Sequence, residues 1–264
     1  MRVVVSGICG KMGQSICKEL LKEEGIEVVG GLDIKDKGMD VGSLLGSQKT
    51  KALVHDSYEQ IKKYSPQLII DFTIAEAAAK TIGWALENNI DIIVGTTGID
   101  KKTLEKIKDQ AERAQSKVFI VPNFSIGAVL MIKMSALITK YFDGCEIIEL
   151  HHDKKKDAPS GTSVMTSEAI GKQKTFAHKR LKEFESETAE NSRGSFLNGI
   201  HVHSIRLPGL LAHQKVIFGT KGQTLTISHD SLDRTSFYPG VLLAIEGLKK
   251  LGNFTYGLDK LIEI

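Results

Sequence analysis

Short apolar runs alternate with helical patterns along the first part of the chain. Arg2–Ser6 is a β-branched run, typical of a buried parallel strand. Behind it, apolar positions recur at helical spacing and predict a helix that ends near Glu24. Ile26–Leu32 is a second strand-like run, and Asp33 follows it directly. The pattern predicts a strand, a helix and a second strand in succession.

The same alternation continues to residue 122. Strands are predicted at Lys51–Val54, Gln67–Asp71, Asp91–Val94 and Lys117–Val121, and helices at Ala75–Asn88 and from the cap Asp100 to Gln115. Strands and helices that alternate in this way form a doubly wound parallel sheet. We therefore expect an α/β domain over residues 1–122.

The pattern changes after residue 122. Ile126–Tyr141 is an apolar helical stretch that we interpret as a bridge between two domains. The elements predicted after it are a strand at Cys145–Leu150, a helix at Ser163–Lys172, a long loop with helical pieces at Thr175–Ser195, and strands at Gly199–Leu207, Lys215–Phe218 and Gln223–His229. They predict a smaller α+β domain with an open mixed sheet over residues 123–233.

Helical patterning returns at Thr235–Leu251, and we expect residues 234–264 to pack on the first domain. One layer of helix is little cover for the open sheet of the second domain. Pairing with further copies of the same sheet would cover it. We therefore expect a homo-oligomer, a homotetramer, formed through the second domain.

The glycine-rich loop Gly7–Gly13 joins the first strand to the first helix. Gly7 permits a tight turn, Gly10 lets the backbone approach a pyrophosphate, and Gly13 lets the helix pack on the strand. The spacing is G-x-x-G-x-x-G rather than G-x-G-x-x-G, so the loop alone also fits a structural turn. Its position, with Asp33 about 20 residues after the last glycine, favours a dinucleotide-binding Rossmann domain.

The cofactor preference rests on the residues that end the second strand. Asp33 would bond the adenosine ribose hydroxyls and repel a 2′-phosphate. Lys35 and Lys37 follow closely, and either could hold that phosphate. NADH and NADPH both remain open, with NADH favoured.

Three loops of small or polar residues follow predicted strands at one edge of the sheet. They are Phe72–Thr73, Gly95–Thr97 and Pro122–Phe124. Ligands of such sheets bind at the carboxyl ends of the strands. By itself the Gly95–Gly98 stretch fits a plain turn equally well. Together the three loops predict that the nicotinamide half of the cofactor lies across them.

The stretch Glu149–Thr162 concentrates two histidines, three lysines and several acids between a strand and a helix. Such a loop is a poor core element, because each buried charge would need a partner. A solvated lysine run is the alternative interpretation. The adjoining His-His pair and the Ser-Gly-Thr turn favour a site for an anionic small molecule.

Two kinds of group in this loop suit an anion. The N–H groups of Gly161, Thr162 and Ser163 would be unpaired at a helix N-terminus and point at a ligand. His151, His152 and Lys155 would supply positive charge and exchangeable protons.

The composition mainly argues against several classes of protein. Of 264 residues, 41% are hydrophobic and 25% charged, and the net charge of +3 is too small to favour nucleic acid or a membrane surface. The three cysteines fit no zinc motif or disulfide framework, so we expect a reducing cytoplasm. The chain enters its first strand at Arg2, and no signal peptide is expected.

No metal site is expected. His151, His152 and Asp153 do not converge as ligands should, and no cysteine joins them. His201 and His203 lie on one face of a predicted strand, and we interpret them as half-buried strand histidines.

The motif E-L-H-H-x-x-K-x-D-A-P-S-G-T at Glu149–Thr162 closely resembles the signature loop of the dihydrodipicolinate reductases, also called 4-hydroxy-tetrahydrodipicolinate reductases. The similarity includes Gly7–Gly13, Gly95–Gly98, Asn123–Gly127 and Arg234–Phe237. It implies NAD(P)H-dependent reduction of 4-hydroxy-tetrahydrodipicolinate to tetrahydrodipicolinate, with loss of water, in lysine and diaminopimelate biosynthesis.

The resemblance also implies roles for single residues. It places the pyrophosphate on Gly7, Ile8, Cys9, Gly10, Lys11 and Met12, the ribose on Asp33, and the nicotinamide beside Gly95, Thr96, Thr97, Val121, Pro122, Asn123 and Phe124. His151 is similar to the family's proton donor or acceptor, and Lys155 to its proton donor. His152, Gly161 and Thr162 are similar to its substrate ligands. The family often has arginine where this chain has Ile34, which supports the preference for NADH.

Two other functions are considered. Another two-domain NAD(P)-dependent oxidoreductase, acting on a small aldehyde or hydroxy acid, would share the first domain but not the Glu149–Thr162 loop. One of the semialdehyde type would need a nucleophilic cysteine, and Cys145 begins a strand. A non-enzymatic NAD(H) sensor would have no need of clustered proton donors.

Overall fold

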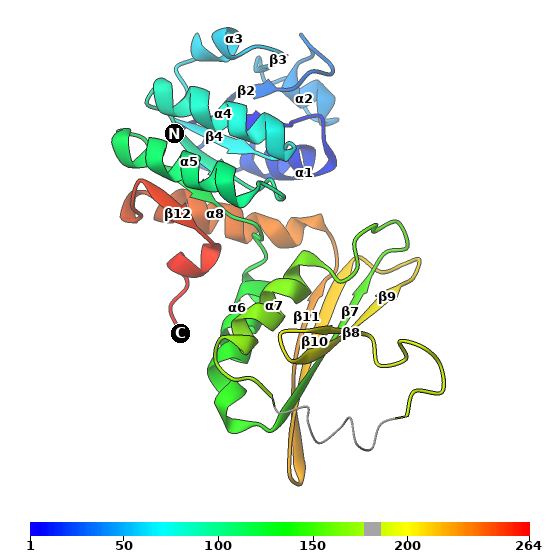
Figure 1. The fold of residues 1–264 in the computed structure, drawn as a ribbon. Helices are drawn as coiled ribbons and strands as arrows, with labels where there is room; N and C mark the ends of the chain where they lie inside the picture. Colours follow the sequence, from blue (N-terminus) through cyan, green and yellow to red (C-terminus); the bar gives the residue numbers. More distant parts are fainter. Residues whose placement is uncertain (177–185) are drawn as a thin grey trace. The chain divides into compact units, whose positions relative to one another are not determined.

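The structure is a computed structural model that describes residues 1–176 and 186–264 (Figure 1). The chain divides into two compact units. Unit 1 comprises Met1–Phe124 and Phe237–Glu263, and unit 2 comprises Ser125–Ser236 with Ile264. The boundaries predicted from sequence were 122/123 and 233/234. The functions assigned to the two domains stay predictions.

Unit 1 is built on a seven-stranded sheet in the order β12-β6-β5-β4-β1-β2-β3. Every neighbouring pair is parallel. The strands are β1 (Arg2–Ser6), β2 (Glu27–Leu32), β3 (Leu53–His55), β4 (Leu68–Asp71), β5 (Asp91–Val94), β6 (Val118–Ile120) and β12 (Phe254–Tyr256). The strand order reverses direction between β1 and β4, which is where ligands bind in such sheets.

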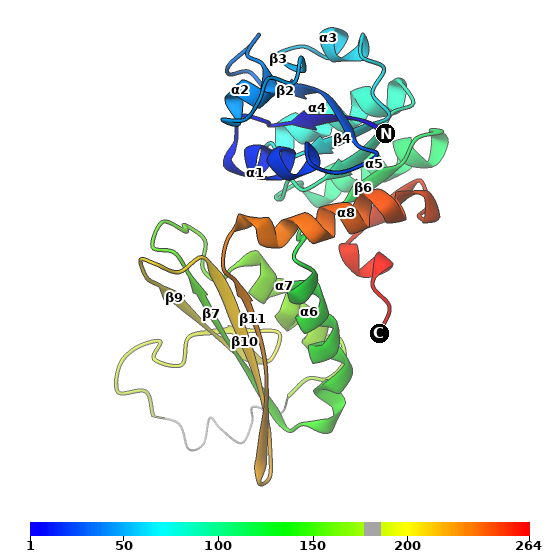
Figure 2. The same ribbon diagram turned by 180° about the vertical axis from the view of Figure 1, so that it is seen from behind.

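Helices cover both faces of this sheet (Figure 2). They are α1 (Lys11–Leu20), α2 (Val41–Leu44), α3 (Tyr58–Lys62), α4 (Ala75–Glu87), α5 (Lys101–Arg113) and α8 (Tyr238–Gly247). The Asp100 side chain accepts the N–H of Thr103 and caps α5, as predicted. Short 3₁₀ turns flank α8 at Arg234–Phe237 and Leu248–Lys250, and another lies at Leu258–Leu261.

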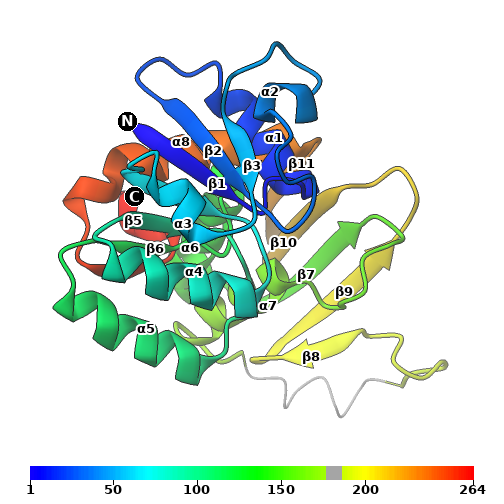
Figure 3. The same ribbon diagram turned by 90° about the horizontal axis from the view of Figure 1, so that it is seen from above.

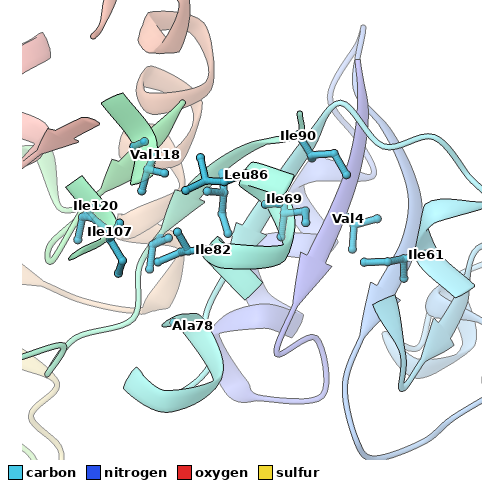
Figure 4. Packing of buried hydrophobic residues seen from close by; sticks show 14 of the residues in the cluster. Val4, Ile61, Ile69, Ala78, Ile82, Leu86, Ile90, Ile107, Val118 and Ile120 are labelled. Carbon is cyan, nitrogen blue, oxygen red and sulfur yellow. The ribbon is translucent and has the colours of Figure 1, made fainter. Parts of the chain in front are cut away.

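The apolar core under α3, α4 and α5 explains why the strands are β-branched. Val4, Ile69 and Ile92 on the strands pack with Ile82 of α4 and Ile107 of α5, and each is at most 3% exposed (Figure 4). Both faces of the central strands are covered, so they read as continuous apolar runs rather than alternating ones.

Unit 2 holds a mixed five-stranded sheet in the order β11-β10-β7-β9-β8 (Figure 3). The strands are β7 (Gly144–His151), β8 (Ser195–Leu197), β9 (Ile200–Arg206), β10 (Ala212–Thr220) and β11 (Gln223–Ser231). The central pair, β7 and β9, is parallel, and the other pairs are antiparallel. Helices α6 (Ile126–Ile138) and α7 (Gly161–Gly171) cover one face of this sheet.

This architecture confirms the predicted fold class. Four short elements were missed: β8, β12, α2 and α3. Each has three to five residues, too few to show a period. The prediction for Thr175–Ser195 falls partly on residues outside the described ranges, and residues 188–193 form bends and turns. No helix in the described ranges is long and apolar enough to cross a membrane.

Two helical glycines provide a matched test of packing. A Cβ on Gly13 would lie 2.2 Å from the Gly7 carbonyl oxygen, whereas a Cβ on Gly83 of α4 would meet nothing within 4 Å. We predict that Gly13→Ala lowers the free energy of unfolding by about 1–3 kcal/mol through overpacking. Gly83→Ala should raise it by about 0.5–1 kcal/mol. Urea unfolding measures both, and equal effects would contradict the close approach at Gly13.

Candidate functional site

Unit 1 carries a pocket of about 470 Å³ at the carboxyl ends of β1, β2 and β4. Its lining includes Gly7, Cys9, Gly10 and Asp33 from the predicted cofactor set, together with Lys35. Gly7 has φ +76°, and a Cβ there would lie 2.6 Å from the Phe72 carbonyl oxygen, so the turn requires glycine. Helix α1 begins directly after this turn, with Gly10 as its N-cap.

The Asp33 carboxylate is held in place by two backbone groups. It accepts the N–H of Cys9 at 3.0 Å and the N–H of Lys35 at 3.1 Å. The Lys37 ammonium pairs with Asp56 at 2.8 Å. Burial and the neighbouring Asp33 carboxylate raise the pKa of the Cys9 thiol to about 12. Cys9 therefore stays protonated and is not a nucleophile at neutral pH.

The remaining residues of the glycine loop differ in what they can offer a ligand. The Ile8 side chain is fully buried, so only its backbone can reach a ligand. Lys11 is exposed and Met12 half-buried, both in the first turn of α1. A pyrophosphate at this position would meet backbone N–H groups and the positive end of a helix dipole.

The buried Asp71 ties together the loops after β4 and β5, and Gly95 packs against the loop after β6. One oxygen of the Asp71 carboxylate accepts the Thr73 hydroxyl at 2.7 Å, the Thr73 N–H at 3.1 Å, and the Thr96 hydroxyl at 2.7 Å. Gly95 lies against the Phe72 and Phe124 rings, where a Cβ would come within 2.8 Å of both. Thr96 and Val121 are buried, Pro122 and Asn123 are half-buried, and Thr97 is exposed.

In unit 2 the charged loop connects β7 to α7 (Figure 1). His151 is the last residue of β7, and His152 is the first of the loop. Helix α7 begins at Gly161 rather than Ser163, and Ser160 is its N-cap. The Ser160 hydroxyl oxygen accepts the Ser163 N–H at 3.2 Å. The prediction that the Ser163 N–H is available to a ligand was therefore wrong, because the helix cap uses it.

Glu149 is the centre of this half of the site. Its side chain has no exposed surface, and it accepts hydrogen bonds from His151, the Ser160 N–H, Arg206 and Ser204. His151 Nδ1 lies 2.5 Å from its carboxylate, and the Ser160 N–H lies at 3.3 Å. The Arg206 guanidinium contacts both carboxylate oxygens, at 2.8 and 2.9 Å. Burial alone would raise the pKa of Glu149. Hydrogen bonds from His151, Arg206 and Ser204 outweigh that effect and lower the pKa from its ordinary value to about 2.

Arg206 extends this network into the loop. It donates to the Asp157 carbonyl oxygen at 2.7 Å. The Asp157 carboxylate in turn holds the Lys155 ammonium, at 2.8 and 2.9 Å. His151 and Lys155, the two predicted proton donors, are therefore joined through Glu149, Arg206 and Asp157.

Sequence reasoning missed Arg206, Asp71 and the role of Glu149. Glu149 stands in the motif, but its burial could not be read from a charged stretch. Arg206 lies 57 residues after Glu149 in the sequence, and only the pairing of β7 with β9 brings it beside Glu149 and His151. Asp71 is the last residue of a predicted strand. Its position at the carboxyl edge of the sheet, where ligands bind, is the sequence feature that could have identified it.

His201 and His203 are half-buried residues of strand β9, as the sequence predicts. His203 Nε2 lies 2.8 Å from Glu146, and the His201 ring packs on Phe196. Within residues 1–176 and 186–264, no group of three or more His, Cys, Asp or Glu side chains could hold a metal ion.

Comparison with known proteins decides the family. The profile of the N-terminus of dihydrodipicolinate reductase matches residues 1–124, and that of its C-terminus matches residues 127–262. The chain belongs to the dihydrodipicolinate reductase family. It is 41% identical over 262 residues to the 4-hydroxy-tetrahydrodipicolinate reductase of Carboxydothermus hydrogenoformans, covering 99% of both chains. It is 42% identical over 265 residues to that of Dictyoglomus turgidum, covering 99% of this chain and 98% of the relative.

Solved structures agree with this membership of the dihydrodipicolinate reductase family. The dipicolinate-bound dihydrodipicolinate reductase from Paenisporosarcina sp. TG-14 superposes with a TM-score of 0.85, at 37% identity over 99% of both chains. An amine dehydrogenase from Mycobacterium smegmatis shares the fold alone, with a TM-score of 0.71 at 12% identity. Family membership confirms the predicted activity, an NAD(P)H-dependent reduction of 4-hydroxy-tetrahydrodipicolinate. The roles of single residues stay predictions.

The lowered pKa of Glu149 has a consequence for stability. Its carboxyl group has an ordinary pKa of 4.5 and a folded value of about 2, so the ionised form stabilises the fold above pH 4.5. That contribution, about 3 kcal/mol, is lost as the pH falls from 4.5 through 2. We predict that the free energy of unfolding depends less steeply on pH in this window for Glu149→Gln than for the unmodified chain.

Chemical denaturation at several pH values measures this difference. Glu76→Gln is the control, because Glu76 is an exposed partner of Lys80 and its variant should retain the pH dependence of the unmodified chain. Parallel curves for Glu149→Gln and the unmodified chain would contradict the assignment.

Proposed function

We propose that the chain performs the reductase reaction with His151 and Lys155 as the proton-handling groups and with Gly161, Thr162 and His152 as substrate ligands. The observation that carries this proposal is the hydrogen-bonded path from His151 through Glu149, Arg206 and Asp157 to Lys155. It organises one loop around two groups that can each release a proton. A surface lysine run would need no such support.

The chemistry fits these groups. Loss of water from the substrate, a cyclic imine with two carboxylates, leaves a conjugated C=C–C=N system. A bound dihydronicotinamide would supply a hydride to a ring carbon, which would leave the ring as a deprotonated enamine with the negative charge shared between nitrogen and carbon. The enamine carbon then takes a proton from the Lys155 ammonium or from His151 as imidazolium. A positioned general acid contributes about 10²–10⁴-fold to the rate.

The carboxylates would be held at the loop and at the start of α7. The Gly161 and Thr162 N–H groups, the Thr162 hydroxyl and the helix dipole favour one carboxylate there. His152 would hold the other end of the ring. The Paenisporosarcina relative is described as dipicolinate-bound, which supports a small dicarboxylate as the ligand class. Fixing the ring in this way also orients it for hydride transfer.

For the cofactor, the pocket of unit 1 suits the adenosine half. Asp33 would accept the ribose hydroxyls, and the glycine loop would receive the pyrophosphate. Lys37 is already paired with Asp56, which leaves Lys35, a lining residue of the pocket, as the cation for a 2′-phosphate. Gly95–Thr97 and Val121–Phe124 would line the nicotinamide. NADH remains the favoured cofactor, and a cytoplasmic location remains a prediction.

A homotetramer formed through the sheet of unit 2 is also proposed. The face opposite α6 and α7 carries Ile148, Leu150 and Ile217, which are half-buried, and Ile205, which is exposed. In the described ranges no helix lies on that face. A second copy of the sheet would bury these side chains and cover the strands.

The activity test uses substrate generated enzymatically, with NADH and NADPH in separate assays. We predict that Lys155→Ala and His151→Ala each lower kcat by about 10²–10⁴-fold. Dissociation constants for NADH should stay near those of the unmodified chain, because both residues belong to unit 2 and not to the glycine-loop pocket of unit 1. Lys154→Ala, an exposed neighbour with the same charge, should retain turnover.

Unchanged turnover in both His151→Ala and Lys155→Ala would reject their assigned roles. Failure of the purified chain to oxidise either cofactor with this substrate, while an aldehyde is reduced, would instead favour the other class of oxidoreductase.

The oligomer has its own test. Ile148→Arg places a charge on the open face of the sheet, and light scattering should then report species smaller than those of the unmodified chain. Leu137→Arg, at an exposed position of α6, should leave the molecular mass unchanged. A monomer from the unmodified chain at micromolar concentration would overturn the proposal.

A further inference from the structure

Strand β7 carries two glutamates that each hold one histidine and one arginine. Glu146 accepts Arg193 at 2.5 Å and His203 Nε2 at 2.8 Å. Glu149 accepts Arg206 at 2.8 and 2.9 Å and His151 Nδ1 at 2.5 Å. The Glu146 side chain is 37% exposed, whereas that of Glu149 is fully buried. The same set of charges therefore occurs twice on one strand, once partly exposed to solvent and once in the protein interior.

In the buried group formed by Glu149, Arg206 and His151, each hydrogen bond can have only one direction. An ionised carboxylate can only accept hydrogen bonds, and a guanidinium can only donate them. Arg206 holds both Glu149 oxygens, and the Ser160 N–H donates to one of them, so the carboxylate stays ionised. The short contact to His151 Nδ1 then requires that Nδ1 carries a proton.

This arrangement determines where His151 can exchange a proton. With Nδ1–H committed to Glu149, the neutral ring has Nε2 as its acceptor, and the charged ring has Nε2–H as the proton available for release. Arg206 balances the carboxylate charge, so the geometry holds whether or not His151 is protonated. The register supports it, because His151 is the β-partner of Arg206, and Glu149 is the partner of Ser204.

We propose that Glu149 and Arg206 are positioning residues that hold His151 in its Nδ1–H tautomer, so that Nε2 is the nitrogen that exchanges the proton of the reaction. The proposal rests on the role of His151 given under Proposed function. Arg206 also holds the Asp157 carbonyl oxygen, so the same guanidinium orients the segment that carries Lys155.

The first test needs no substitution. In ¹⁵N-histidine-labelled protein at a pH where the ring is neutral, the His151 signals should show a protonated Nδ1 and an unprotonated Nε2. The chain has eight histidines, and the signal missing from His151→Ala assigns the resonance. A protonated Nε2 with a bare Nδ1 would overturn the proposal.

The second test compares Glu149→Gln with Glu146→Gln. A glutamine at 149 keeps the shape but can donate as well as accept, so the tautomers of His151 should mix. We predict a kcat about 10- to 100-fold lower for Glu149→Gln, by analogy with the loss seen when the hydrogen-bond partner that orients a metal-bound histidine is removed. The KM of the substrate and the affinity for NADH should change much less. Glu146→Gln should alter neither the His151 signals nor kcat.

Arg206→Lys is a second variant that keeps the proposal testable where Glu149→Gln does not fold. It keeps the positive charge but loses the bidentate contact with Glu149, and it should lower kcat while His151 retains the Nδ1–H signal. Equal kcat values for Glu149→Gln and Glu146→Gln, in folded protein, would overturn the positioning role. By contrast, full turnover in His151→Ala would overturn the proposed function of His151, whatever tautomer the signals report.

Discussion

The Glu149 carboxylate lies in the interior of unit 2 with no exposed side-chain surface. An isolated charge placed there would cost several kcal/mol, so the surrounding chain has to supply compensating donors. It does so from three places: the end of β7, the end of β9 and the N-cap of α7. The same donors fix the ends of those elements. The electrostatic requirement of one side chain thereby fixes both ends of the loop, at His151 and at Ser160.

Two kinds of positive charge occur in that loop, and the structure separates them. Lys154 and Lys156 are exposed, as expected of a solvated lysine run. Lys155 is held by Asp157, whose carbonyl oxygen is held by Arg206. Family membership makes the chemistry of the substrate known. The hydrogen-bond network explains how a lysine and a histidine of this loop region are held in fixed positions for it.

Much of this was predictable because it follows from local pattern. Buried β-branched strands, the glycine turn and the Asp100 cap each have a signal within a few residues. What could not be predicted depends on pairing between distant segments. Arg206 meets Glu149 only through the β7–β9 pairing, and β12 joins the sheet only through β6. The Ser163 N–H was assigned to a ligand because the sequence does not distinguish a helix's own cap from a binding site.

Strand β12 also determines how unit 1 is completed. Its partner β6 ends at Ile120, and more than a hundred residues of unit 2 separate the two strands in the chain. During synthesis, residues 125–236 leave the ribosome before the residues of α8 and β12 do. Residues 125–236 can form the core of unit 2 at that stage, while the β6 edge of unit 1 is still unpaired. The last contacts made in unit 1 are therefore those of highest sequence separation, and they close an edge that would otherwise be open to other chains.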